Sequence, residues 1–293
     1  MTKLYKEYIQ PSSISDALQA LSGVSGSVAV IAGGTDLLLD LRQGRHNPVD
    51  QLIDVSGIAE MGQIVIKDEH VYIGAAVTHN DIIHNSDLSE HARCVVEGCG
   101  LIGGPQVRNV ATIGGNVSHA LPAGDGTISL LALDTEVQIA SLDGMSWQPL
   151  IGIFAGPGEV TFDRRKEIVV GFRFKTRGNR EGSSFYRVMR PQGVAIAILN
   201  MAAWVKLSED RKIENVRISC GPAGPKPFRA SKMEEYLKGK TWDDSIYQKA
   251  SKILADEVSL RTSKHRATKE YRHKLLPMLL QEVLDIAVER AEL

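Results

Sequence analysis

Two short glycine-bearing segments are the parts of this 293-residue chain whose residue types and spacing could do chemistry. They read Ala32-Gly33-Gly34-Thr35-Asp36-Leu37 and Thr112-Ile113-Gly114-Gly115-Asn116. Each follows an apolar run typical of a strand, and each carries bare backbone amides followed by a small polar residue. Because glycine has no Cβ, phosphate oxygens can approach the main chain closely, and successive N–H groups form an anion-binding concavity. If both segments close on one diphosphate, the chain binds a large dinucleotide such as FAD.

Asp125 is a further candidate, because it lies in a glycine-rich stretch shortly after the second segment. Its carboxylate could accept hydrogen bonds from the hydroxyl groups of a ribityl chain or a ribose. It could equally cap a helix that begins at Thr127. The residues alone leave both interpretations open, and they also leave ordinary tight turns as an alternative for the two glycine segments.

Other motifs favour structural roles. Gly98 to Gly103 matches the GxGxxG pattern, but a helical run precedes it and Pro105 follows, whereas a dinucleotide fingerprint needs a strand before it and a helix after it. We therefore predict a tightly packed helix end there. The histidines, His79 and His84 among them, lack the spacing of metal ligands on one helix face, and solvated or capping roles are expected.

Two basic clusters stand out, Arg164-Arg165-Lys166 and Lys264-His265-Arg266. A run of charges is more often a solvated surface than a phosphate site. We interpret both clusters as solvated surface, with contact to a partner subunit as the alternative for one of them.

Composition excludes several classes of protein. The chain has 34 basic and 35 acidic side chains, a balance that argues against nucleic-acid binding. Residues 1–11 hold no apolar core of signal-peptide length, and the longest nearly apolar stretch, 193–205, contains Asn200 and is too short to span a bilayer. Three cysteines suit neither a disulfide framework nor an iron–sulfur cluster. We predict a cytoplasmic protein with no metal site of its own.

The elements that must position these residues follow from hydrophobic periodicity and turn signals. Before residue 177 we expect helices at 13–23, 36–43, 90–103 and 127–133, a helix start at 78, strands at 27–32, 52–55 and 110–113, and hairpins at 63–74 and 136–147. After a linker at 177–182 we expect strands at 184–189, 195–206 and 213–220, then helices at 230–238, 243–256 and 268–289. The first strand–loop–helix–strand series predicts a βαβ unit.

The segments Ile31–Leu37 and Gly104–Asn116 closely resemble the FAD-binding subunit of the molybdenum hydroxylases, the family of xanthine dehydrogenase, aerobic carbon monoxide dehydrogenase and nicotinate dehydrogenase. The lead Pro-Gln-x-Arg-Asn into Thr-x-Gly-Gly-Asn is specific, and the resemblance covers nearly the whole chain. It implies an α+β fold. A two-part FAD module of the vanillyl-alcohol-oxidase type, with subdomains at 1–57 and 58–176, would precede a C-terminal α/β domain of the CO dehydrogenase flavoprotein type at 177–293.

The resemblance also implies roles for individual residues around FAD. One side of the diphosphate would be wrapped by Val30, Ile31, Ala32, Gly33, Gly34, Thr35, Asp36 and Leu37, and the other side by Ala111, Thr112, Gly115 and Asn116. Asp125 would meet the sugar-alcohol chain, Val169 would lie against the isoalloxazine ring, and Arg187 would stand where a lysine often lies near the flavin. No catalytic side chain is implied, because the flavin performs the redox chemistry.

Two departures from the family pattern concern the flavin end of this site. Arg187 replaces an ammonium by a planar, permanently charged guanidinium. The stretch Arg190-Pro191-Gln192-Gly193-Val194 lacks the acidic residue often found a few positions after the position of Arg187. Some family members also carry a cysteine-rich insertion for an extra iron–sulfur cluster, and this sequence has none.

The implied function is electron transfer within a heterotrimer. A large subunit would hold a molybdenum cofactor, a small subunit would carry [2Fe–2S] clusters, and FAD in this chain would pass electrons to NAD⁺, a quinone or another acceptor. The alternative is a degenerate flavoprotein that serves only as a scaffold for assembly. A reductase of the peptidoglycan pathway type shares the FAD fold, but the sequence shows no segment matching its proton donor and glutamate.

Overall fold

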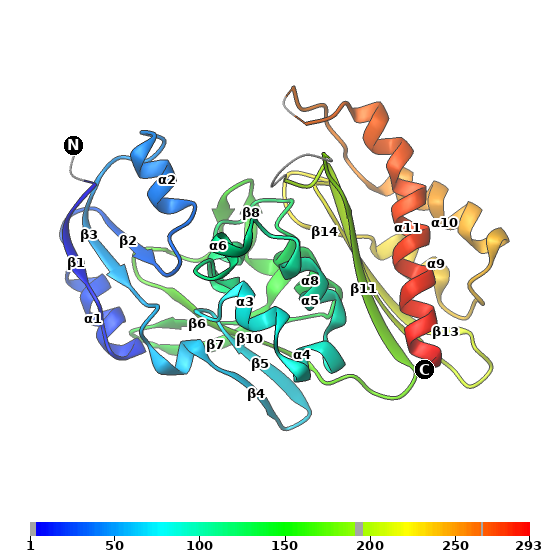
Figure 1. The fold of residues 1–293 in the computed structure, drawn as a ribbon, viewed down its shortest axis with the longest axis horizontal. Helices are drawn as coiled ribbons and strands as arrows, with labels where there is room; N and C mark the ends of the chain where they lie inside the picture. Colours follow the sequence, from blue (N-terminus) through cyan, green and yellow to red (C-terminus); the bar gives the residue numbers. More distant parts are fainter. Residues whose placement is uncertain (1–3, 191–195, 265) are drawn as a thin grey trace.

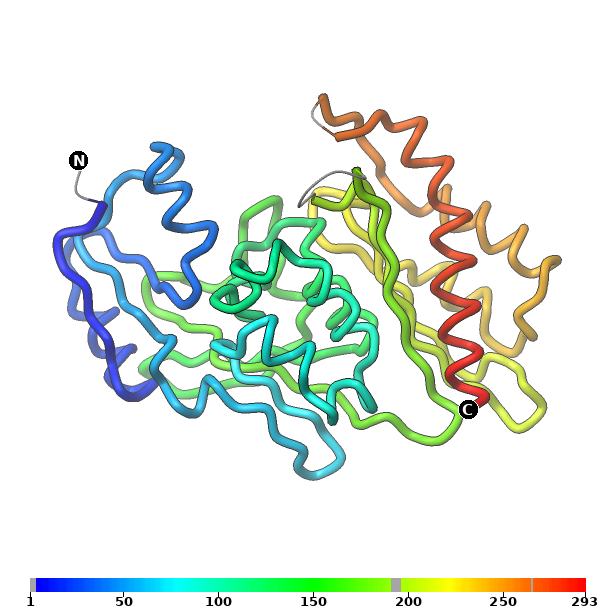
Figure 2. Tube along the Cα trace, viewed as in Figure 1, coloured from blue at the N-terminus to red at the C-terminus, as the bar shows by residue number. Residues whose placement is uncertain are grey.

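The computed structural model describes residues 4–190, 196–264 and 266–293. Three sheets lie one after another along the long axis of the molecule, each accompanied by helices (Figure 1). Figure 2 follows the chain from the N-terminal sheet through the middle of the molecule to the last helix at the opposite side. Among the described residues, no helix combines the length and apolarity that crossing a bilayer requires.

The N-terminal sheet has three parallel strands in the order β1-β3-β2. Its elements are β1 (Tyr5–Ile9), α1 (Ile14–Gly23), β2 (Val28–Ile31), α2 (Leu37–Arg42) and β3 (Val49–Asp54). The hydroxyl of Ser13 accepts from the Asp16 amide and so caps α1 at the predicted position. Helix α2 connects the parallel strands β2 and β3, which confirms the predicted βαβ unit.

The middle sheet is antiparallel, in the order β4-β5-β10-β6-β7. Its strands are β4 (Ile64–Lys67), β5 (His70–Gly74), β6 (Glu136–Ser141), β7 (Gly144–Pro149) and β10 (Ile168–Lys175), and a small sheet holds β8 (Phe154–Gly156) and β9 (Glu159–Val160). The helical elements are η1 (Ala59–Gly62), α3 (His79–Ile83), α4 (Ser86–His91), α5 (Arg93–Gly100), α6 (Pro105–Arg108), α7 (Ile113–Ser118), α8 (Asp125–Ala132) and η2 (Leu150–Ile153). Both hairpins form where the sequence predicted them.

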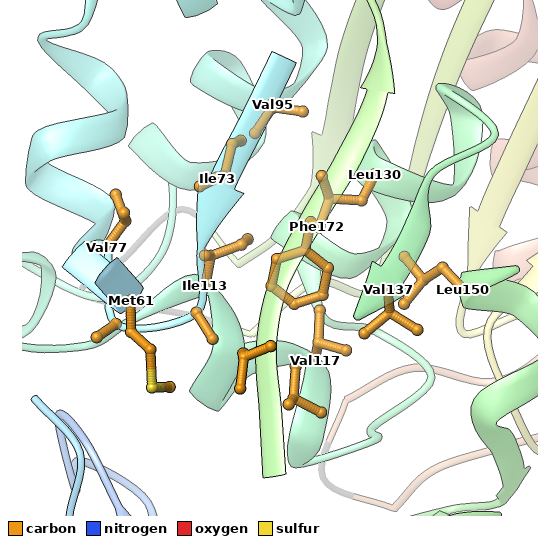
Figure 3. Close-up of a cluster of buried hydrophobic side chains, with 14 of the residues drawn as sticks. Met61, Ile73, Val77, Val95, Ile113, Val117, Leu130, Val137, Leu150 and Phe172 are labelled. Carbon is orange, nitrogen blue, oxygen red and sulfur yellow. The ribbon is translucent and has the colours of Figure 1, made fainter. Parts of the chain in front are cut away.

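Apolar side chains fix the short helices of this region on the middle sheet. Figure 3 shows Ile113 and Val117 of α7, with Leu130 of α8 and Val137 of β6, gathered around Phe172 of β10. All of these side chains are fully buried. The position of α7, and therefore of the second glycine segment at its start, is set by this core.

The C-terminal sheet is antiparallel, in the order β11-β12-β13-β14. It comprises β11 (Glu181–Val188), β12 (Leu199–Leu207), β13 (Ile213–Gly221) and β14 (Phe228–Arg229), followed by α9 (Ser231–Leu237), α10 (Asp244–Glu257) and α11 (Lys269–Glu292). Along β12, Ala202 and Trp204 join the core shared with the middle region, whereas Met201 and Val205 join the core beneath the last helices. A strand buried on both faces explains the apolar run that begins at 193.

Two sequence predictions were wrong at the level of elements. The helix expected over 90–103 is divided between α4 and α5, which are separated at Ala92. The strand expected over 110–113 does not form: Thr112 makes one isolated bridge to Thr78 and then starts α7. Ile113 is buried in the core and Ala111 is 7% exposed, but Val110 is 49% exposed, so the apolar run is neither a strand nor a continuous buried face.

Candidate cofactor site

The first glycine segment forms the turn between the carboxyl end of β2 and the start of α2. Gly34 has φ +65°, a backbone conformation that favours glycine. Gly33 lies directly against the second segment: a Cβ added to it would sit 2.0 Å from the Val110 carbonyl oxygen and 2.7 Å from Ala111 Cα. The two segments therefore converge, as the diphosphate hypothesis requires, and this contact leaves no room for a side chain at residue 33.

The second segment forms the N-terminus of α7 and is already occupied by internal hydrogen bonds. The Gly114 amide donates to Ala75 O at 2.9 Å, and the Gly115 amide donates to the Thr112 hydroxyl at 3.1 Å. A Cβ on Gly114 would lie 2.5 Å from Ala75 O, so this glycine is required by the packing of α7 on the sheet. Gly115, by contrast, is exposed, and a Cβ there would meet only Thr112 Oγ1 at 3.2 Å.

The two segments differ in what they can offer an anion. Within the described part of the chain, the main-chain N–H groups of residues 32–36 donate to no acceptor. The expectation that each segment carries bare amides is therefore met by the first and is wrong for most of the second, where the Thr112 amide alone in 112–116 has no acceptor among the described residues. The first segment therefore offers main-chain N–H donors. The second offers an exposed backbone position without a side chain at Gly115.

Asn116 and Asp125 have hydrogen-bond partners within the chain that the sequence did not indicate. The Asn116 side-chain oxygen accepts from both the amide and the hydroxyl of Thr127, each at 3.0 Å, so Asn116 ties α7 to α8. Helix α8 begins at Asp125 itself, with Gly124 as N-cap and no side-chain cap. The hypothesis that Asp125 caps a helix starting at Thr127 is thus wrong, because the Asn116 amide oxygen takes that amide.

The Asp125 carboxylate is instead held by two side chains of the C-terminal sheet. Arg187 donates to Asp125 Oδ2 at 2.5 Å, and Asn200 donates to Oδ1 at 2.6 Å. Arg187 and Asn200 are opposite each other in the β11–β12 register, so one cross-strand pair grips both carboxylate oxygens. The side chains of Asp125 and Arg187 are only 7% and 5% exposed, which makes this a buried ion pair.

Burial and charge act in opposite directions on this pair. Burial raises the pKa of the Asp125 carboxyl, while the Arg187 charge and the Asn200 and Arg187 hydrogen bonds lower it; the raising effect of burial is the larger. Two polar atoms beside the carboxylate, Arg187 Nε and Asn200 Oδ1, are also buried with no hydrogen-bond partner among the described residues. One is a donor and the other an acceptor, so the junction retains hydrogen-bonding capacity of both kinds.

Val169 and the residues after Arg187 complete the predicted set. Val169 lies on β10 with 6% exposure, inside the main apolar core. The neighbouring Val170 carbonyl accepts from the Ala75 amide, and the Ala75 carbonyl accepts from Gly114, so β10 and α7 are linked through one residue. The departure noted at 190–194 falls largely on residues 191–195, which lie outside the described residues.

His79 and Asn200 are buried polar residues in contact with candidate site residues, and the sequence interpretation did not single them out as such. His79 was expected to be solvated or capping, but it is 1% exposed, its amide donates to Ala111 O, and the capping role belongs to Thr78. Its Nδ1 is buried and has no hydrogen-bond partner in the described part of the chain. Burial, and then the charge of Arg108, lower the pKa of His79 to about 4. For Asn200 a signal existed, since it is a polar residue within the apolar run 193–205.

The GxGxxG segment has the structural role predicted for it. A Cβ on Gly98 would lie 2.4 Å from Ser129 Oγ and 3.0 Å from Asp125 O, so glycine here allows α5 to pack closely on α8. Gly103 has φ +53°, after the end of α5. The segment holds α8, and with it Asp125, in place.

His79 should make the stability of the protein depend on pH. Its folded pKa of about 4 lies below the ordinary 6.5, so the fold favours the neutral ring. This contribution is fully present above about pH 6.5 and is lost as the pH falls toward 4, by roughly 3 kcal/mol. In urea titrations, His79→Phe should lose this component, whereas exchanging the exposed His46 in the same way should leave it. Equal pH profiles for wild type and His79→Phe would contradict the assignment.

The Asp125–Arg187 pair should show strong energetic coupling. Replacing Arg187 by Met leaves the Asp125 carboxylate buried without its cation, and we expect a loss of about 3 kcal/mol in unfolding free energy of the FAD-free chain. Asp125→Asn in the same chain should restore much of it. A double-mutant cycle from urea unfolding measures the coupling, and additive single effects would show that the two side chains act independently.

Comparison with known proteins places this geometry in a family. The family model described as "FAD binding domain in molybdopterin dehydrogenase" matches residues 3–174, and the "CO dehydrogenase flavoprotein C-terminal domain" matches residues 184–287. The xanthine dehydrogenase FAD-binding subunit of Escherichia coli O157:H7 is 28% identical over 98% of this chain and 97% of its own length. The nicotine 6-hydroxylase medium subunit of Paenarthrobacter nicotinovorans is 30% identical over 94% of this chain and 95% of its own.

The fold agrees with a solved relative. The structure superposes on a chain of carbon monoxide dehydrogenase from Hydrogenophaga pseudoflava with a TM-score of 0.92, at 24% identity and covering 99% of both chains. The predicted α+β fold class and the resemblance stated from the sequence are confirmed. The chain therefore belongs to the FAD-binding subunits of the molybdopterin dehydrogenase family: it is an oxidoreductase subunit, and its cofactor is FAD.

Proposed function

We propose that this chain is the electron-transfer subunit of a multi-subunit molybdenum hydroxylase and that it holds the FAD diphosphate between its two glycine segments. The observation that carries the proposal is the convergence of Gly33 on Val110, beside main-chain N–H groups that have no acceptor within the described part of the chain. The xanthine dehydrogenase and nicotine 6-hydroxylase relatives are themselves named as subunits. A domain division near residues 57 and 176 is part of the proposal.

The residues present fit a diphosphate. The amides of residues 32–36 are available as donors, Gly33 packs against Val110 and Ala111 without a Cβ, and Gly115 leaves the exposed start of α7 free of a side chain. Anions are favoured at such sites because N–H groups and the positive end of a helix dipole point toward them. In this proposal Val30 to Leu37 wrap one side, while Ala111, Thr112, Gly115 and Asn116 line the other. Asn116 acts indirectly, by holding α7 on α8.

The remaining predicted residues would serve the flavin end. Arg187 Nε and Asn200 Oδ1 are the free donor and acceptor of the Asp125 junction, and they suit the hydroxyl and carbonyl groups of a flavin. Asp125 would orient both side chains while accepting from the sugar-alcohol chain, and Val169 would supply apolar contact near the ring. Bound FAD supplies the conversion between single-electron and two-electron transfer. A fixed guanidinium would favour negative charge on the reduced ring.

Partner subunits and the electron acceptor follow from the family. Electrons would come from [2Fe–2S] clusters of a small subunit, after substrate hydroxylation at a molybdenum cofactor in a large subunit, and would leave to NAD⁺ or another acceptor. The absence of a nucleophile or acid–base constellation from the predicted site agrees with a chain whose task is to hold a redox cofactor and set its environment.

FAD binding should depend on Gly115 in a way that is separable from folding. Gly115→Val places a branched side chain on the exposed start of α7, and we expect at least a tenfold weaker FAD affinity, measured by flavin fluorescence titration of the refolded chain. Gly152→Val is the matched control, since a Cβ there meets nothing within 4 Å. Gly114 is unsuitable because its substitution disrupts the contact with Ala75. Undiminished FAD affinity in folded Gly115→Val would overturn the diphosphate site.

In the assembled complex, the same variant separates electron transfer from scaffolding. With Gly115→Val, substrate should still reduce the iron–sulfur clusters, while transfer to the soluble acceptor should fall with the flavin content. Cluster bleaching and acceptor reduction are followed in parallel by absorbance. If acceptor reduction continued at the wild-type rate in a flavin-free complex, the alternative function, a subunit that only supports assembly, would be correct.

A further inference from the structure

Arg272 is a buried cation whose Nε has no hydrogen-bond partner among the described residues. It lies in the first turns of α11, its side chain is 2% exposed, and it is the largest of the fully buried side chains. Among residues 4–190, 196–264 and 266–293, no hydrogen bond or ion pair satisfies its guanidinium, and Nε is enclosed with no acceptor. Burying a cation without an anion is costly, so such a group calls for a counter-charge from outside the chain.

The groups around Arg272 are also cationic. Burial, then Arg266, then Arg261 lower the pKa of Arg272, and no carboxylate appears among its influences. Arg266 is half-buried and its own pKa is lowered by burial and by Arg261, which is exposed. Glu270, the acidic residue of the first turn, is exposed, and its pKa is lowered by hydrogen bonds from its own amide and from Thr268, then by the charges of Lys269 and His273. Among these three arginines, Arg272 is therefore buried, Arg266 is half-buried and Arg261 is exposed to solvent.

The backbone keeps this arrangement in place. Thr268 caps α11 by accepting from the Tyr271 amide, and Thr262 accepts from the Lys269 amide at 3.0 Å. Ser263 and Ala267 form an isolated bridge, which closes the turn that carries Arg266. Since helical side chains lean toward the N-terminus, Arg272 is directed toward this turn and toward the positive end of a 24-residue helix.

The position of Arg272 on the helix shows that its burial is built into the sequence. Arg272 is followed at helical spacing by Leu275, Leu276 and Leu279, which are all buried, so it lies on the stripe that packs on the C-terminal sheet. The basic cluster around Lys264, expected to be solvated surface, is therefore only partly so: Lys264 is exposed, Arg266 is not, and His265 lies outside the described residues.

We propose that Arg261, Arg266 and Arg272 form a binding site for a phosphoryl anion at the N-terminus of α11, separate from the FAD site. Guanidinium groups match phosphate oxygens through several directed hydrogen bonds, and a phosphoryl group offers three oxygens and more negative charge to three cations, whereas a carboxylate offers two oxygens and a single charge. Because Arg272 is buried and Arg261 is exposed, the site suits a compact anion that enters from solvent. The phosphoryl group can be free or belong to a nucleotide, and the experiment distinguishes these sources.

The test uses the full chain saturated with FAD, so that the diphosphate site is filled. Thermal unfolding is measured with added inorganic phosphate, pyrophosphate or AMP, against sodium chloride at equal ionic strength. We expect one or more of these anions to raise the Tm by about 3 °C at tenfold excess over its Kd. A response to AMP alone would indicate a nucleotide, and a response to phosphate or pyrophosphate a free anion.

Variants decide whether the arginines are responsible. Arg272→Met should abolish the anion response and, because it removes an uncompensated charge, should raise the Tm measured in chloride. Arg266→Met, which leaves the buried arginine in place, should weaken the response severalfold and covers the case in which Arg272→Met does not fold. Lys252→Met, on the exposed side of α10, is the charge-matched control. The proposal would be overturned if no phosphate compound raised the Tm of the wild-type chain, or if the arginine variants responded as the wild type does. The counter-charge of Arg272 would then be a carboxylate of a partner protein.

Discussion

The close approach of Gly33 to the Val110 carbonyl is the contact on which the cofactor site depends. It joins the small parallel sheet to the helices of the middle region, and it brings the donors of residues 32–36 to the start of α7. A side chain at residue 33 would separate the two parts by the width of a methyl group or more. Glycine at residue 33 is thus needed for a steric reason. The N–H groups of residues 32–36, which have no acceptor among the described residues, provide the positive potential that an anion needs.

The second glycine segment shows how the same residue type serves a different purpose. Gly114 is buried against Ala75, and this contact sets how deeply α7 sits on β10. Gly115, one position later, faces outward. Adjacent glycines therefore have separate functions, one in positioning the helix and one in leaving its first turn open. The apolar contacts of Ile113 and Val117 with the sheet make that position rigid (Figure 3).

A second constraint is the way in which the C-terminal sheet holds the cofactor module. Arg187 and Asn200 reach out of that sheet to Asp125, and Arg290 reaches from α11 to Glu97 of α5 at 2.6 Å. Charged and polar groups from the two sides are therefore matched across the boundary, which fixes the distance between the two parts. Arg187 acts at this boundary, since its guanidinium binds Asp125 through Nη1 while its Nε has no partner among the described residues.

Much of the fold could be predicted from the sequence, because many elements are specified by residues close to them in the chain. The cap at Ser13, the hairpin turns and the apolar stripe of α11 are each determined within a few residues. Residues 110–113 could not be assigned in this way, since Ile113 is buried through tertiary contacts whereas Val110 is exposed. The partners of Asp125 were also out of reach, because they come from strands more than sixty residues later. Asn200 and Arg272 did leave a signal: each interrupts an apolar pattern at a position that the pattern requires to be buried.

Polar residues at buried positions of an apolar pattern are better indicators of a binding site than exposed charged residues are. Exposed basic residues are solvated, and their free energy changes little whether a ligand is present or not. A polar group kept inside an apolar layer costs stability unless something compensates it, and for Arg187 Nε, Asn200 Oδ1 and Arg272 Nε no described residue does. At the Asp125 junction the flavin is a suitable partner. At α11 the surroundings are cationic, so the compensating group must carry negative charge.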